Sequence, residues 1–130
     1  MKNTNHTIMV TRWQAETLYQ SVESYIFTVN FVADKESEYY HSIMESADAI
    51  KCELTWLKDE TITEHPVTLT RKQANFASTA FDAFIYVVDD SINMDVWDDF
   101  FEMNRDLNRK LTEIMGVCKE GEADGESDGE

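Results

Sequence analysis

The residues of this chain that could do chemistry are few, and carboxylates dominate them. Glu38 and His41 are spaced as Glu-x-x-His, which places a carboxylate and an imidazole one helical turn apart, as in the metal sites of helical bundles. Such sites need further inward carboxylates and a second Glu-x-x-His, whereas the second half of the chain has Asp95-x-x-Asp98 at the equivalent place. Two polar residues on an exposed helix face explain the pattern better, so no metal site is predicted.

Nucleophilic and nucleotide-dependent catalysis have no recognisable arrangement either. His6 and His65 lack a Ser, Cys or Asp pattern that would supply a nucleophile and its base. Every glycine lies at or after Gly116, which leaves no glycine-rich loop to hold a phosphate. Acid pairs such as Asp89 and Asp90 are common in so acidic a chain, and solvated carboxylates are their simplest interpretation. We therefore expect a protein that is not an enzyme and needs no cofactor.

Net charge is the strongest compositional signal. The 130 residues include 26 Asp and Glu against 11 Lys and Arg, a formal charge of −15. This charge repels phosphates and argues against direct binding of nucleic acid. No stretch resembles a membrane span, and the N-terminus lacks the apolar run of a signal peptide. Because Cys52 and Cys118 belong to no zinc or disulfide pattern, we expect a cytoplasmic protein without a membrane partner.

One stretch carries acids without local counter-charge, because residues 73–104 contain seven Asp and Glu and no Lys or Arg. On the last expected helix they lie opposite the apolar stripe and form an outer anionic ridge. That ridge consists of Asp95, Asp98, Asp99, Glu102 and Asp106. The residues predicted to bind a partner are Asp89, Asp90, Asp95, Asp98, Asp99 and Glu102.

The ridge has two interpretations that the sequence leaves open. Acids in the first turns of a helix are favoured by its dipole, and Arg105, Arg109 and Lys110 balance the C-terminal half, so the ridge could be only a solvated face. Alternatively, it docks on a basic protein surface. One ridge is too sparse to imitate a DNA duplex, because acids at i and i+4 lie about 6 Å apart, whereas duplex phosphates follow about every 1.7 Å of axis.

The leading hypothesis is a non-enzymatic protein-binding module that occupies a basic, nucleic-acid-binding surface of a host protein. Its size and charge are analogous to those of phage inhibitors that mimic DNA, including anti-restriction and anti-CRISPR proteins. The alternative is a self-associating structural or adaptor protein, a homodimer with exposed strand edges whose acidity keeps it soluble.

An internal duplication predicts the elements that position these residues. Placing Ile8 over Val67 aligns residues 8–29 with 67–88. The identical pairs include Thr11/Thr70, Arg12/Arg71, Gln14/Gln73, Ala15/Ala74, Ile26/Ile85 and Val29/Val88. In both halves Thr-x-x-Gln, the capping-box spacing, follows a short β-rich run. We expect Thr11 and Thr70 to cap amphipathic helices over 12–29 and 71–88.

A second helix follows in each half. Placing Tyr40 over Trp97 brings the apolar positions of the two into register and aligns Ala47 with Asn104. Asn104 is therefore expected to be a buried or half-buried polar residue that needs a partner. The aromatic residues expected as core anchors are Phe81, Phe84, Trp97, Phe100 and Phe101.

The predicted fold class is α+β and mostly helical, with tandem strand-helix-helix units at about 7–60 and 66–117 related by a pseudo-two-fold axis. Two short strands pair with each other, and four helices cover them, because a lone strand pair is marginally stable in water. An all-α four-helix bundle is the alternative. Residues 1–118 are expected to form one globular domain. Residues 119–130, rich in Gly, Glu and Asp, are expected to form a disordered acidic tail.

Overall fold

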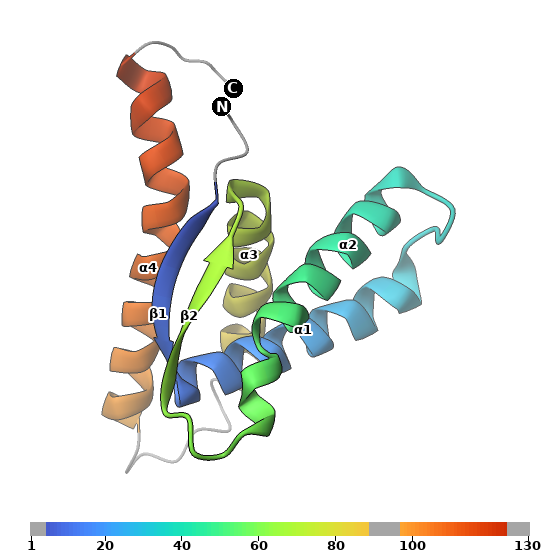
Figure 1. Ribbon diagram of the computed structural model, residues 1–130. Helices are drawn as coiled ribbons and strands as arrows, with labels where there is room; N and C mark the ends of the chain where they lie inside the picture. Colours follow the sequence, from blue (N-terminus) through green and yellow to red (C-terminus); the bar gives the residue numbers. More distant parts are fainter. Residues whose placement is uncertain (1–4, 89–96, 125–130) are drawn as a thin grey trace.

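The computed structural model of the chain describes residues 5–88 and 97–124. Within these ranges the chain forms two strands, four α-helices and one short 3-10 helix (Figure 1). In chain order they are β1 (His6–Thr11), α1 (Arg12–Val32), α2 (Glu38–Glu53), η1 (Thr55–Lys58), β2 (Glu64–Leu69), α3 (Arg71–Val88) and α4 (Trp97–Asp124). The predicted α+β, mostly helical class is confirmed.

The two strands pair with each other, as the sequence predicts, and the structure shows that their orientation is antiparallel. Ile8 lies opposite Val67, and Val10 lies opposite His65. Val10, Val67 and Leu69 are buried, whereas the alternate residues Thr7 and Met9 face outward. The strands therefore have one apolar face toward the helices and one polar face toward solvent.

Two capping boxes start the helices that follow the strands. Thr11 Oγ1 accepts a hydrogen bond from the Gln14 N–H at 3.1 Å, and Gln14 Oε1 accepts one from the Thr11 N–H at 3.0 Å. Thr70 and Gln73 form the same two bonds at the start of α3. The capping prediction is confirmed for both helices, because the motif satisfies helix N–H groups from local residues alone.

The helices enclose the strand pair on its apolar side (Figure 1). α1 and α3 pack extensively against each other, α4 runs beside β1, and α1 and α2 form an antiparallel hairpin that projects to one side. One core cluster includes side chains from both halves of the chain, among them Leu18, Ile50, Phe81 and Leu107. This packing fixes where the outer faces of α3 and α4 lie.

The sequence interpretation treats both outer strand edges as exposed, but on each edge a helix side chain forms a hydrogen bond with the strand backbone. Lys110 Nζ on α4 donates to the Met9 carbonyl at 2.6 Å. On the other edge, Glu53 Oε1 at the end of α2 accepts from the Thr68 N–H at 2.8 Å. The expectation of free edges is therefore wrong at these positions, because α4 runs beside β1 and the C-terminal end of α2 reaches the edge of β2 (Figure 1).

Arg12 ties the start of α1 to the connector before β2. Its Nε donates to the Ile62 carbonyl at 2.8 Å, and its Nη1 donates to the Leu57 carbonyl at 3.1 Å. Its Nη2 donates to the Asp59 carbonyl, and its guanidinium lies 5.7 Å from the centre of the Trp56 ring. One planar side chain thus binds three carbonyls, one in η1 and two in the connector between η1 and β2.

The expected core anchors differ in burial. Phe81 is fully buried and Phe100 is 6% exposed, as predicted. Phe101 is 47% exposed, so the prediction that it is a core anchor is wrong. Met103 is buried in its place, because on a helix that turns about 100° per residue position 101 lies at the flank of the inward stripe. Phe84 is half-buried, and the Trp97 side chain lies outside the described residues.

α4 extends beyond the expected domain boundary at residue 118. The helix continues to Asp124, into the segment 119–130 for which the sequence predicts a disordered tail. The predicted boundary at residue 118 is therefore not the end of the helix. Residues 125–130 lie outside the described residues.

Candidate functional site

Three of the six predicted partner-binding acids are described, and they lie together. Asp98 and Asp99 are in the first turn of α4, and Glu102 follows one turn later. All three are exposed, and within the described residues none of them takes part in an ion pair. Asp89, Asp90 and Asp95 lie outside the described residues. We call the three described carboxylates the acidic turn of α4.

The predicted ridge does not continue to Asp106. This carboxylate accepts hydrogen bonds from Arg109 at 2.8 Å and from Gln14 Nε2 at 2.7 Å, and Lys110 lies 3.0 Å away. Hydrogen bonds from Arg109 and Gln14 hold the pKa of Asp106 well below its usual range. Asp106 is therefore a paired carboxylate and not part of an uncompensated outer ridge, because Arg109, Lys110 and Gln14 from α1 all reach it.

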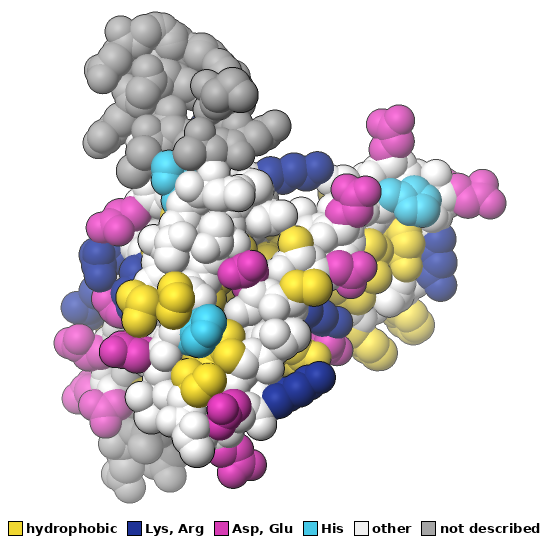
Figure 2. Space-filling view, in the orientation of Figure 1, with side chains coloured by type: hydrophobic (Ala, Val, Ile, Leu, Met, Phe, Trp, Pro, Cys, Tyr) yellow, Lys and Arg dark blue, Asp and Glu magenta, His cyan; other side chains and the backbone are white. Residues whose placement is uncertain are grey.

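The C-terminal half of α4 carries mixed charge. Arg109 pairs with Glu113 at 2.9 Å as well as with Asp106, and Figure 2 shows Lys and Arg side chains intermingled with Asp and Glu along the edge where α4 lies. In this half of α4, Arg109 and Lys110 form ion pairs with the neighbouring acids, as expected if they balance the helix's negative charge. Over residues 98–116, the part of α4 whose side chains the structure describes, the acidic turn is the surface of one sign.

Next to the acidic turn is an apolar hollow between α3 and α4. One wall is formed by Phe81, which is buried, and Ile85, which is partly buried. Tyr86 and Phe101 also line the hollow, and they are 87% and 47% exposed. The hollow has a volume of about 530 Å³, within the range of about 300 to 1,000 Å³ that is common for ligand pockets. The guanidinium of Arg105 lies 5.1 Å from the centre of the Phe101 ring.

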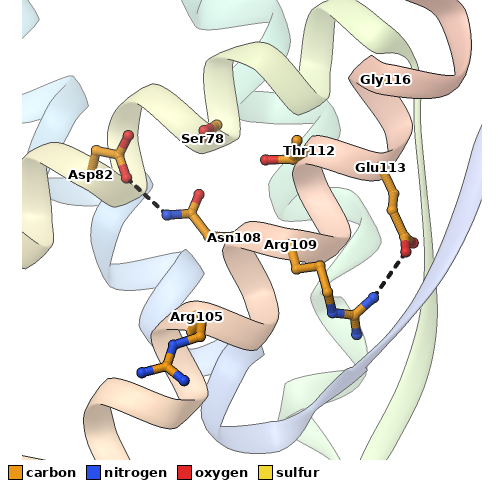
Figure 3. Close-up of a pocket in the computed structure, with 8 residues that line it drawn as sticks. All are labelled: Ser78, Asp82, Arg105, Asn108, Arg109, Thr112, Glu113 and Gly116. Atoms are coloured by element: carbon orange, nitrogen blue, oxygen red, sulfur yellow. Dashed lines mark hydrogen bonds and ion pairs between the residues drawn. The ribbon is translucent and has the colours of Figure 1, made fainter. Parts of the chain in front are cut away.

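The hollow continues into a polar part along the same two helices. Asp82, Arg105 and Asn108 line both parts, so we treat them as one feature and call it the α3–α4 groove. Figure 3 shows Asp82 and Asn108 pointing toward each other between the helices, while Arg109 turns to Glu113. Asn108 Nδ2 donates to Asp82 Oδ1 at 3.4 Å, a long bond that crosses the groove.

Asn104 lines the apolar part of the groove. It is 7% exposed, which confirms the predicted burial of a polar residue on the inward side of α4. Its Oδ1 atom is buried and accepts no hydrogen bond from any described residue. A buried acceptor that lacks a donor costs about 1 to 3 kcal/mol.

Glu38 and His41 do not form a metal site among the described residues. Both are exposed on α2, and the His41 ring packs against Tyr40 with 5.8 Å between ring centres. No group of three or more His, Cys, Asp or Glu in residues 5–88 and 97–124 is arranged to hold a metal ion.

The groove was not predicted from the sequence. Its lining comes from the outer flank of α3 and the flank of α4, and their separation depends on how the two helices pack across the core. The only signal for it in the sequence is Asn104, a polar residue in an otherwise apolar stripe.

Comparisons of the chain with protein families, with curated proteins and with solved structures find no match. Among the described helices, none is long and apolar enough to cross a membrane.

Proposed function

We propose that the chain is a non-enzymatic protein-binding module whose acidic surface docks on a basic site of a partner protein. The observation that carries this proposal is the acidic turn of α4, three exposed carboxylates without ion pairs among the described residues, next to the exposed rings of Phe101 and Tyr86. Interfaces commonly combine apolar and aromatic anchors with a charged rim. The partner would present Lys or Arg around an apolar side chain.

The basic site, in this proposal, is one that otherwise binds nucleic acid, and the chain acts as an inhibitor of the kind that phages and mobile elements encode. The net charge of −15 supports a basic partner. The acidic turn offers three carboxylates, too few to imitate a duplex, so mimicry would also need Asp89, Asp90, Asp95 and the acidic end of the chain. A cytoplasmic setting is part of the proposal, and the exposed free thiol of Cys52 favours a reducing compartment.

Affinity capture from host lysate with charge-matched variants tests this proposal. One variant carries Asp98→Asn, Asp99→Asn and Glu102→Gln, which removes the acidic turn while keeping its shape. The control variant removes three exposed acids of α2 by Glu38→Gln, Glu45→Gln and Asp48→Asn. Both variants have the same net charge, so a difference in capture between them depends on where the three charges were removed and not on how many.

We expect the unchanged chain and the control variant to capture a basic protein at low salt and to release it at high salt, since screening shortens the field to about 8 Å at physiological ionic strength. The acidic-turn variant should capture much less of it. If both variants retain the same partner with the same salt dependence, the acidic turn is a solvated helix face and the proposal fails.

We also propose that the fold arose by duplication of one strand-helix-helix unit, with a pseudo-two-fold axis between the strands. The register supports this, because Ile8 pairs with Val67, the residue that the sequence alignment gives as its counterpart. The strand edges support it too. Glu53 aligns with Lys110 and Thr68 with Met9, and both aligned pairs join a second helix to a strand edge.

A second candidate function is self-association as a structural or adaptor protein. It no longer rests on free strand edges, but an apolar patch near the end of α1 favours it. Phe27 and Phe31 are 73% and 86% exposed, and their rings stack with 6.2 Å between centres beside the exposed Val32. Exposed apolar clusters often mark protein interfaces.

Light scattering across a concentration series separates the two functions. A dimer that becomes monomeric on Phe31→Ser, while the acidic-turn variant remains dimeric, would favour the adaptor function. A monomer at every concentration would exclude self-association through this patch.

A further inference from the structure

A small polar pocket lies where α1, α2 and α3 pack against one another, and none of the described residues of α4 lines it. Its volume is about 230 Å³. The polar residues that line it are Tyr25, Tyr39, Ser42, Ser46, Lys72, Asn75 and Thr79. Ile43 and Phe76 complete the lining, and the Phe76 ring meets the Tyr25 ring edge-on with 5.5 Å between ring centres. We call this feature the Ser46 pocket.

Ser46 marks the pocket as a binding position. The residue is 5% exposed and lines the pocket, yet its Oγ forms no hydrogen bond with any described residue. Buried polar groups in folded proteins nearly always have a partner. The side-chain atoms of the described ranges that are both fully covered and unpartnered are Trp56 Nε1 and Asn104 Oδ1. Ser46 Oγ is unpartnered but not fully covered, so a molecule in the pocket can reach it.

Three neighbouring side chains also lack partners. Ser42 lies one turn before Ser46 on α2, and Lys72 and Asn75 lie one turn apart on α3. None of the Ser42, Lys72 and Asn75 side chains forms a hydrogen bond or an ion pair with a described residue. The pocket therefore brings together two hydroxyls, an amide and an ammonium group whose donors are available to a ligand.

Charge sets this pocket apart in so acidic a chain. Lys72 is the charged residue that lines it, and no described Asp or Glu does, whereas Asp82 lines the α3–α4 groove. Burial and the neighbouring Tyr39 hydroxyl raise the pKa of Tyr25, so this phenol stays uncharged at neutral pH. Lys72 also lies in the first turn of α3, where the helix dipole favours an anion. One positive charge beside several uncharged donors suits an oxyanion.

We propose that the Ser46 pocket binds a small phosphomonoester. Lys72, Ser46 and Asn75 donate to its phosphate oxygens, and Ile43 and Phe76 pack against its carbon atoms. A phosphomonoester has a charge of about −1.5 to −2 at pH 7 and three strong acceptor oxygens, which match one ammonium and several neutral donors. Because the pocket is smaller than the range of about 300 to 1,000 Å³ common for drug-sized ligands, the carbon part must be short.

This site goes beyond the proposed protein-binding function, because it uses none of the acids of the acidic turn. The net charge of −15 opposes an anion only at short range, since charges farther away than about 8 Å are largely screened at physiological ionic strength. The local charge at Lys72 therefore decides binding.

NMR titrations of the ¹⁵N-labelled full chain with phenyl phosphate and with inorganic phosphate, at constant ionic strength, test this inference. Both probes should shift the backbone amides of Ser42 and Ser46 and the side-chain amide of Asn75. Phenyl phosphate should bind more tightly, because its ring adds apolar contact with Ile43 and Phe76. Equal affinities would identify free phosphate as the ligand and overturn the ester part of the proposal.

Substitutions of the named donors make the test specific. Ser46→Ala should fold normally, because it removes an unpartnered buried hydroxyl, and should bind phenyl phosphate about five-fold more weakly. Lys72→Gln should bind it at least about ten-fold more weakly, because it removes a charged donor. Lys58→Gln is the charge-matched control, since Lys58 is exposed and does not line the pocket, and it should bind as the unchanged chain does.

Two results would overturn the inference. One is the absence of shifts at Ser42, Ser46 and Asn75 with either phosphate. The other is equal weakening by Lys72→Gln and Lys58→Gln, which would show that phosphate responds to the overall charge of the chain and not to this pocket.

Discussion

Phe100 and Phe101 are adjacent in the sequence but lie in opposite environments, and this contrast gives a sharp prediction. Phe100 is 6% exposed, and its ring packs 6.1 Å from that of Trp13. Phe101 is 47% exposed at the rim of the α3–α4 groove. Replacing each in turn by Ala removes the same atoms from two neighbouring positions of one helix.

The expected costs follow from burial. Phe100→Ala should lower the free energy of unfolding by about 3 to 5 kcal/mol, the range for a fully buried Phe. Full burial of a Phe side chain stabilises the fold by about 1.5 to 3 kcal/mol. Because Phe101 is 47% exposed, its burial contributes about half of that free energy. Its contact with Arg105 adds about 0.5 kcal/mol at an exposed site. Phe101→Ala should therefore cost about 1 to 2 kcal/mol.

Urea unfolding of the two variants at pH 7, with free energies extrapolated to water, measures the difference. The two variants should differ by about 1 to 4 kcal/mol, in the direction of a larger loss for Phe100→Ala. Equal losses would show that Phe101 is covered in solution and would remove it from the candidate binding surface.

Three further predictions concern the contacts that hold the fold. Thr11→Ala and Thr70→Ala should each cost about 1 kcal/mol in urea unfolding, because each removes an N-cap acceptor; an unchanged midpoint would contradict the capping boxes. Asp106→Asn should cost about 0.5 to 1 kcal/mol at pH 7. Because folding lowers the Asp106 pKa, that stability is present above the unfolded pKa near 4 and declines as pH falls further; a constant difference from pH 7 to pH 2 would refute the paired carboxylate. Arg12→Lys should speed amide hydrogen exchange in residues 57–62, because a Lys cannot hold three carbonyls; unchanged exchange there would contradict the clamp.

The parts of the fold that could be predicted from the sequence depend on local chemistry. The capping boxes at Thr11 and Thr70 join residues three apart, so their spacing alone identifies them. The pairing of the two strands under a cover of helices followed from the marginal stability of a lone strand pair in water. The burial of Asn104 followed from the periodicity of the stripe that contains it.

The parts that were missed depend on contacts between distant residues. Asp106 appears free in the sequence, but Gln14 from another helix donates to it. Phe101 lies at the edge of the apolar stripe, where a small rotation of α4 decides between core and surface. The α3–α4 groove requires the relative placement of two helices, which no local pattern specifies.

The central claim is that the acidic turn of α4 recognises a basic partner, and association kinetics test it most directly. The measurement compares the association rate of the purified captured partner with the acidic-turn variant and with the charge-matched α2 variant, from low to physiological salt. We predict that the acidic-turn variant associates at least about ten-fold more slowly at low salt and with a weaker salt dependence, because charges at an interface chiefly steer encounter. Equal association rates for the two variants at every salt concentration would contradict the account.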